Sequence, residues 1–213
     1  MKGNIEKLSV FVMIAAIAMF MPVGMASADH NRNVTGEYAF TGRVSYILTP
    51  FGFDPTTLVP NNPNSVTSNS INCQGIFTFK HDGTGRFDST GVLLVLPPQF
   101  SPSQFPHANK FTWSFTFTYD VADDDTITID ADENTFHVTF DTGPGSGVIS
   151  FTADKYPLSG WVSADHKTMT LGSPTTFIQT LTFQPPPIPV QQGIPNSSYV
   201  LIRLGPIERG GRF

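Results

Sequence analysis

Residues 111–119 alternate strictly between aromatic and small hydroxyl side chains. The odd positions hold Phe111, Trp113, Phe115, Phe117 and Tyr119, and every even position holds threonine or serine. A period of two is typical of a β-strand, because successive side chains point to opposite faces of the sheet. Five rings on one face cover roughly 750–1250 Å² of apolar area. This face is therefore expected to lie against a core, a ligand cavity or lipid.

Similar alternating runs, separated by turn residues, recur from Gly36 to Leu204 and predict further strands. The expected strands are 36–48, 71–80, 85–96, 110–119, 126–130, 135–141, 147–153, 158–163, 167–172, 176–183 and 198–204. Some neighbouring runs can belong to one bent strand. We expect an all-β fold, an antiparallel meander of about 8–11 strands closed into a barrel, because closure removes unpaired edges. A two-sheet β-sandwich is the alternative.

The connections between these strands predict two unlike ends. Long connections at 49–70 and 97–109 would share one end of a simple meander. The short turns at 81–85, 142–146 and 164–167 would share the other end. Long loops on a rigid scaffold commonly carry binding sites, and these contain Phe51, Phe53, Phe100 and Phe105. They are expected either to rim the mouth of the barrel or to fold back and plug it.

The two ends of the chain differ in character from the middle. Residues 1–28 have a basic start, an apolar run and Ala26-Ser27-Ala28, the layout of a secretory signal peptide cleaved near Ala28. The protein is then exported, to the periplasm or the extracellular space. The expected division beyond it is a barrel domain (29–184), a Pro-rich spacer (185–197), a closing strand (198–204) and a flexible tail (205–213).

Composition narrows the range of functions. The formal net charge is −5 and the basic residues are scattered, which argues against a nucleic-acid partner. Cys73 is the single cysteine, so no internal disulfide forms, and its place in an apolar strand favours a buried side chain. Phosphate loops, nucleophile elbows and paired zinc-ligand motifs are missing, so we expect no enzyme activity and no cofactor.

Histidines at two turns raise the question of a metal site. His81 and His166 each neighbour an aspartate, and in a meander their turns share an end with Asp123-Asp124-Asp125. The spacing matches no known ligand pattern, and turns attract polar residues in any case. We interpret these groups as solvated turn residues and expect no metal.

The start of the expected barrel, Thr35-Gly36-Glu37-Tyr38, resembles the Gly-x-Trp opening of lipocalins and other calycins, with Tyr38 in place of tryptophan. In that family an arginine near the last strand packs on this aromatic ring, and Arg203 is suitably placed for the role. The resemblance implies a structural function for Gly36, Tyr38 and Arg203. It also implies a carrier of small apolar ligands.

Three functions fit these observations. The first is an exported, soluble barrel that binds a small apolar ligand, lined by the five rings of 111–119 with the loop phenylalanines at its rim. The second is an interaction module of the cell envelope or extracellular space, whose protein partner the sequence does not identify. The third is an outer-membrane barrel with the stripe facing lipid, although several strands are short for this. We favour the first and expect no stable membrane insertion.

Overall fold

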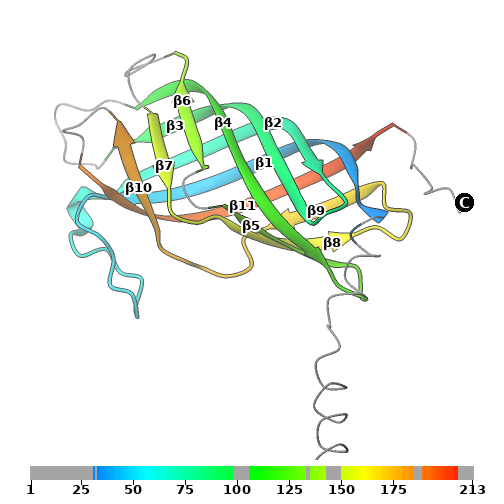
Figure 1. Ribbon diagram of the computed structural model, residues 1–213. Helices are drawn as coiled ribbons and strands as arrows, with labels where there is room; N and C mark the ends of the chain where they lie inside the picture. Colours follow the sequence, from blue (N-terminus) through cyan, green and yellow to red (C-terminus); the bar gives the residue numbers. More distant parts are fainter. Residues whose placement is uncertain are drawn as a thin grey trace, which may run out of the picture.

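The computed structural model describes residues 31, 33–97, 106–132, 135–142, 150–184 and 189–205. Within these ranges the chain forms eleven strands and one 3₁₀ helix. The strands of Figure 1 are β1 (Gly36–Thr49), β2 (Thr67–Phe79), β3 (Thr84–Leu96), β4 (His107–Val121), β5 (Thr126–Ala131), β6 (His137–Phe140), β7 (Ser150–Ala153), β8 (Pro157–Val162), β9 (Thr168–Gly172), β10 (Gln179–Gln184) and β11 (Gln191–Leu204), and the 3₁₀ helix η1 is Pro63–Ser65. The all-β prediction is confirmed, and each expected strand has a counterpart. The expected signal peptide, Phe100, Phe105, residues 185–188 and the tail beyond Gly205 lie outside the described residues.

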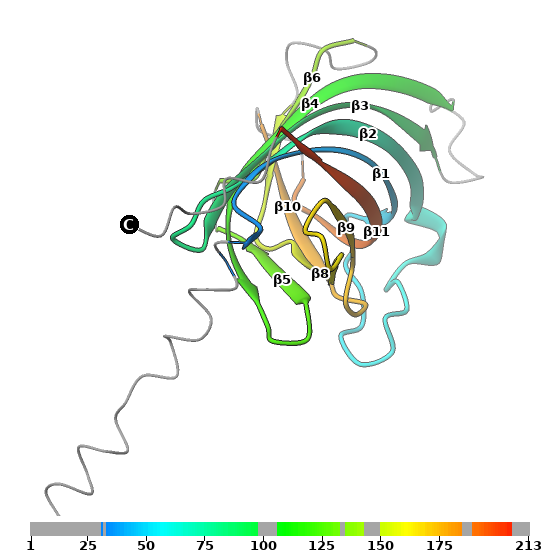
Figure 2. The ribbon, with the colours of Figure 1, turned by 90° about the vertical axis from the view of Figure 1, so that its right-hand side faces the viewer.

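All the described strands belong to one antiparallel sheet that closes on itself. The ring of eight runs β1-β2-β3-β4-β5-β8-β9-β11, and β11 pairs with β1 from Glu37 opposite Leu204 to Thr49 opposite Gln192. Figure 2 shows the long strands β1 to β4 arching over β5, β8 and β9. A single closed sheet confirms the barrel-like prediction, and the alternative of two packed sheets is wrong.

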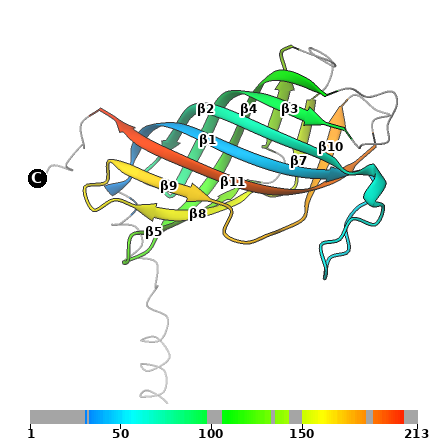
Figure 3. The ribbon, with the colours of Figure 1, turned by 180° about the vertical axis from the view of Figure 1, so that it is seen from behind.

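At three positions of this ring, two short strands lie end to end in place of one long strand: β5 with β6, β8 with β7, and β9 with β10. β5 and β6 both run along β4 in the same direction, β5 beside Phe117–Val121 and β6 beside Phe111–Ser114. On their other side, β5 pairs with β8 and β6 pairs with β7. β9 and β10 both pair with β11. The wall facing the long strands is thus divided into a turn-side panel (β5, β8, β9) and a pocket panel (β6, β7, β10). Figure 3 shows β11 running alongside both panels. We call the five long strands, β1 to β4 and β11, the frame.

The broken strands correct the expected position of the turn at 142–146. β6 ends at Phe140 opposite Phe111, and the Asp141 amide donates to the Lys110 carbonyl at 2.8 Å. The connection from β6 to β7 therefore leaves from the long-connection end, not from the end with the tight turns. The prediction was wrong because it counted β5 and β6 as two strands of opposite direction.

The closing strand is also longer than expected. β11 begins at Gln191, so residues 191–197 belong to the sheet and not to the Pro-rich spacer. Pro195 lies opposite Tyr46 on β1, in a stretch of β11 between the pairings with β10 and β9, where none of the described strands pairs with its other side. Proline is tolerated there because no amide is needed for a ladder on that side.

Aromatic side chains fill the middle of the ring. The rings that are buried there include Phe40, Phe77, Phe79, Phe87, Phe115, Phe117, Phe136, Tyr156 and Tyr199. Neighbouring rings pack in stacked or edge-to-face pairs, and the closest, Phe87 and Phe115, have centroids 4.5 Å apart. The alternate positions of β4, such as Lys110 and Thr118, face solvent. The aromatic stripe therefore faces the interior, which removes the basis for placing it against lipid.

Candidate ligand pocket

The aromatic stripe of β4 serves two purposes along its length. Phe115, Phe117 and Tyr119 are at most 5% exposed and pack within the central cluster of rings. Phe111 and Trp113, nearer the long-connection end, line a small interior pocket. Three of the five predicted ligand-binding rings therefore belong to the solid core, and two belong to the wall of a cavity.

The pocket lies between the frame and the pocket panel. Its lining is almost entirely apolar and consists of Tyr46, Ile71, Leu93, Phe111, Trp113, Phe136, Val138, Phe140 and Phe151. The cavity volume is about 20 Å³, which is room for roughly one water molecule. A larger guest would have to move side chains of the lining outward.

Few polar atoms stand in this wall, and they differ in their partners. The Tyr46 hydroxyl donates to the side-chain oxygen of Gln179. The side-chain amide nitrogen of Gln179 in turn donates to the Lys155 carbonyl. Trp113 is 3% exposed, and its indole Nε1 has no hydrogen-bond partner among the described residues. Ser89, directly opposite Trp113 on β3, is 7% exposed, and its hydroxyl is also unpaired there. The pocket region thus combines apolar walls with unused hydrogen-bonding capacity.

The groups near the pocket that can ionise are held neutral. Burial, followed by the neighbouring Tyr156, raises the pKa of Tyr46 well above its ordinary value. Burial raises the pKa of the Cys73 thiol to about 12, and its Sγ lies 3.7 Å from the Gly42 carbonyl oxygen. Both side chains are protonated near neutral pH, so they offer hydrogen bonds and not charge.

Phe51 and Phe53 do not join this pocket. Phe51 is 59% exposed, whereas Phe53 is buried and its amide donates to the Gln192 side chain on β11. The connection between β1 and β2 contacts β11 through Phe53, and neither Phe51 nor Phe53 is among the residues that line the pocket. Phe100 and Phe105 lie outside the described residues, and their prediction is untested.

Seven residues of the lining were missed by the sequence analysis: Tyr46, Ile71, Leu93, Phe136, Val138, Phe140 and Phe151. Their inward direction was readable from strand alternation. Their convergence was not, because it depends on the break between β5 and β6, which brings Val138 beside Trp113.

The opposite end of the barrel carries the contacts that were expected of a structural site. The Arg203 guanidinium lies 5.6 Å from the Tyr38 ring centroid and donates to the carbonyls of Asn33 and Thr35. Gly36 has a φ of +132°, and a side chain there would approach the same guanidinium. This is the contact that the calycin resemblance implies, and by itself it does not show membership of that family.

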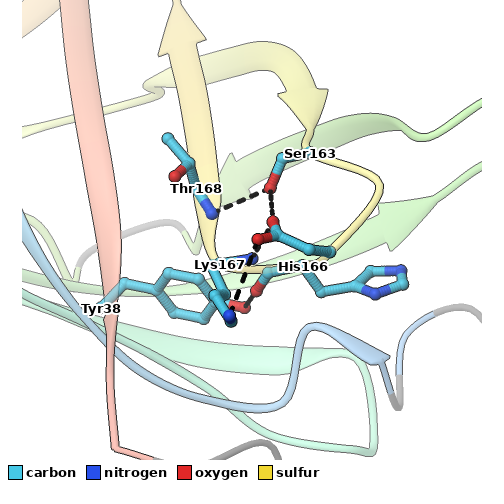
Figure 4. A network of polar contacts seen from close by, with 6 residues as sticks. Tyr38, Ser163, His166, Lys167 and Thr168 are labelled. Atoms are coloured by element: carbon cyan, nitrogen blue, oxygen red, sulfur yellow. Dashed lines mark hydrogen bonds and ion pairs between the residues drawn. The ribbon is translucent and has the colours of Figure 1, made fainter.

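The Tyr38 hydroxyl also fixes the turn between β8 and β9. It donates to the His166 carbonyl at 2.9 Å, while Asp165 accepts from Ser163 and from the Lys167 amide. Figure 4 shows the His166 imidazole pointing away from Tyr38. In the described ranges no three histidine, cysteine or acidic side chains gather into a metal-binding group.

Two broader hollows lie on the outer side of β1 to β4 and share Gln74 and Thr90; the larger one extends to β6, and Ser89 and Trp113 also border it. Their volumes are about 670 and 510 Å³. Outward side chains such as Thr112 and Thr139 are exposed hydroxyl groups of the kind that covers the solvated face of an antiparallel sheet. Because these linings consist largely of exposed polar side chains, we place the candidate site in the apolar interior pocket, which Trp113 also lines.

Comparison with known proteins identifies no relative. No protein family and no curated protein sequence matches the chain. Among solved structures, the enduracididine biosynthesis enzyme MppR, complexed with the condensation product of pyruvate and imidazole 4-carboxaldehyde, is 12% identical and aligns over 81% of this chain and 89% of its own, with a TM-score of 0.20. Its pyruvate complex is 13% identical with the same TM-score. These scores are too low to carry an argument about fold or function. No helix in the described ranges is long and apolar enough to cross a membrane.

Proposed function

We propose that the protein binds a small, largely apolar molecule in the pocket between the frame and the pocket panel. The observation that carries this proposal is the composition of the wall, nine large apolar or aromatic side chains with two polar ones, Tyr46 and Trp113, among them. Small-molecule sites are typically built in this way, with apolar walls for affinity and a few polar groups for orientation.

The size of the cavity determines how such a ligand would enter. With about 20 Å³ free, the pocket has no room for a molecule much larger than water, so the ligand would displace one of its walls. The pocket panel is the wall held by the shortest pairings. In the described residues β6 meets β7 through Val138–Phe151 and Thr139–Ser150, whereas β1 and β2 pair from Gly36 to Leu48. Short pairings open at lower free energy, so the panel is the natural entrance.

Native mass spectrometry of the protein from the exported fraction of its host tests the proposal. We expect an additional mass that disappears on denaturation and whose value begins to identify the ligand. A bare polypeptide mass, together with no binding in a screen of small aromatic and aliphatic compounds, would contradict it.

A matched pair of substitutions locates the site. Val138→Phe would fill the pocket and abolish the additional mass, because Val138 is 5% exposed and lines the cavity. Val92→Phe makes the same chemical change on the outward face of β3, where Val92 is 38% exposed, and should leave the additional mass unchanged. Equal loss in both variants would mean that the ligand binds elsewhere.

We also propose that the protein acts after export, because residues 1–28 have the layout of a signal peptide. N-terminal sequencing of the protein from its host is expected to begin at Asp29. A chain that still begins at Met1 would contradict export by this route.

A second candidate function, self-association, is favoured by an apolar patch on the outer face of β8 and β11. Trp161 is 66% exposed, and Val200, Ile202 and Leu204 are 44%, 61% and 47% exposed. Trp161 and Val200 are both paired with Thr170, so they lie in one row across the sheet. Such patches mark interaction surfaces. Sedimentation velocity should show a dimer that becomes a monomer in Trp161→Ser; a monomeric parent protein would exclude this function.

A further inference from the structure

The interior contains hydrogen-bonding atoms that the fold itself does not use. Among the described residues, buried side-chain atoms without a partner are the Asn69 Oδ1, the Ser89 Oγ and the Trp113 Nε1. Native proteins satisfy nearly all such groups, so each unpaired one is a candidate for contact with a guest. Trp113 is the one of the three that also lines the pocket.

The chemistry of these atoms defines what the guest must supply. An indole N–H only donates, and a serine hydroxyl donates or accepts, so an acceptor is the one group that satisfies both. Ser89 and Trp113 are direct cross-strand neighbours on β3 and β4 and both are inward, which places their Cβ atoms about 4.5–5.5 Å apart. Ser89 is not among the residues that line the pocket, so the Trp113 indole N–H is the unpaired donor at the pocket wall.

A resident water is a poor alternative for this position. Buried waters make about three hydrogen bonds and are found in polar cavities. The lining here contributes one other polar side chain, Tyr46, whose hydroxyl is already committed to Gln179. A water would therefore be weakly held and easily displaced.

We propose that the ligand is an apolar molecule with a single exposed carbonyl oxygen, of the ketone or ester class, which accepts from the Trp113 Nε1–H. This inference rests on the proposed function and narrows its ligand class. The carbonyl specifies orientation, and the skeleton occupies the space between Phe111, Val138 and Phe151.

The test compares acetophenone with ethylbenzene, which have similar shapes and differ in the carbonyl oxygen. The protein is the full chain labelled with ¹⁵N at tryptophan, and Trp161→Phe identifies the Trp113 indole resonance, since the chain has two tryptophans. We expect acetophenone to bind about tenfold more tightly, as one added hydrogen bond would give. It should also shift the Trp113 indole proton downfield, whereas ethylbenzene should not.

The variants separate the two proposals. Trp113→Phe, which keeps an aromatic ring in the pocket wall but removes the indole N–H, should reduce the preference for acetophenone while ethylbenzene binds as before. Equal binding of both compounds, with an unmoved indole resonance, would overturn the carbonyl inference and leave the proposed function standing. Binding of neither compound, nor of larger matched ketone and hydrocarbon pairs, would overturn both.

Discussion

The aromatic residues of β4 have different structural roles along the strand, and substituting them should change the stability of the fold by different amounts. Phe115 is 1% exposed and stacks on Phe87 and Phe136 in the filled core. Phe115→Ala should lower the free energy of unfolding by about 3–5 kcal/mol, because it removes apolar contacts and leaves a cavity. Urea denaturation measures this change. The matched control is Thr118→Ala on the outward face of the same strand, expected within about 0.5 kcal/mol of the parent.

Phe111→Ala provides a second comparison, because Phe111 borders the pocket and not the solid core. Phe111→Ala should lower the free energy of unfolding by less than Phe115→Ala does, since the wall around Phe111 is already incompletely packed. Equal losses would indicate that the pocket is as rigidly packed as the centre.

Arg203 joins the last strand to the first through its planar guanidinium. It contacts the Tyr38 ring and the carbonyls of Asn33 and Thr35 together, which a lysine ammonium cannot do with the same geometry. Arg203→Lys should therefore lower the unfolding free energy by about 1–2 kcal/mol despite the conserved charge. Differential scanning calorimetry would record the fall in melting temperature.

The control for Arg203 is Arg43→Lys on β1, where the guanidinium makes an exposed hydrogen bond to Asn72. That change should leave the melting temperature nearly unmoved. If the two variants behave alike, the guanidinium of Arg203 has no special role in closing the ring.

At the scale of elements, alternation together with turn residues located every strand, although β2 and β11 begin earlier than expected. Period-two runs such as 84–96 and 107–121 face a core on one side and solvent on the other, so their pattern survives in the sequence. The breaks between β5 and β6 or β9 and β10 leave no such signal, because they look like ordinary turns. Their consequence, two panels and a pocket between one panel and the frame, depends on pairings between residues far apart in the chain.

The same limit explains what was found of the site. Phe111 and Trp113 were predicted from one conspicuous stretch, while Tyr46 and Phe151 come from strands that meet them through closure of the ring. Local patterns report which side of a strand is buried. They do not report where packing inside a barrel is dense and where it leaves space.

The two panels should also differ in how readily they open. β6 and β7 are short, and the pocket panel joins β11 through Gln179, Thr180 and Leu181 in the described residues. Amides of β7 should exchange with deuterium at least about tenfold faster than those of β2, because short pairings open locally at lower free energy. Exchange followed by mass spectrometry measures this, with β8 of the turn-side panel as the internal comparison. Uniform protection of β2, β7 and β8 would contradict the panel as entrance.

The whole molecule buries every tyrosine in the chain. The five are Tyr38, Tyr46, Tyr119, Tyr156 and Tyr199, and all face the interior of the ring. Burial is the main cause of a raised pKa in each, to about 12 for Tyr38 and Tyr119. Their ordinary value is 10.0, so above that pH the unfolded chain loses protons that the folded protein keeps.

This difference makes the fold sensitive to alkali. The stabilisation from each neutral tyrosine is complete below pH 10.0, the ordinary tyrosine value, and is lost as pH rises through the raised value. Between these limits the unfolding free energy should fall by up to about 1.4 kcal/mol per pH unit for each proton involved. Cys73 adds to the same trend, because burial raises its pKa from 9.0 to about 12.

An alkaline titration followed by ultraviolet absorbance and circular dichroism checks this expectation. Tyrosinate absorbance should appear in one cooperative step that coincides with loss of the β-sheet circular dichroism signal. The buried tyrosine hydroxyls ionise only when the sheet opens. Tyr38→Phe removes one shifted group and should make the fall in stability with pH less steep. Gradual ionisation of all five tyrosines near pH 10.0 in a protein that keeps its β signal would show that the interior admits solvent, and the filled core described above would be wrong.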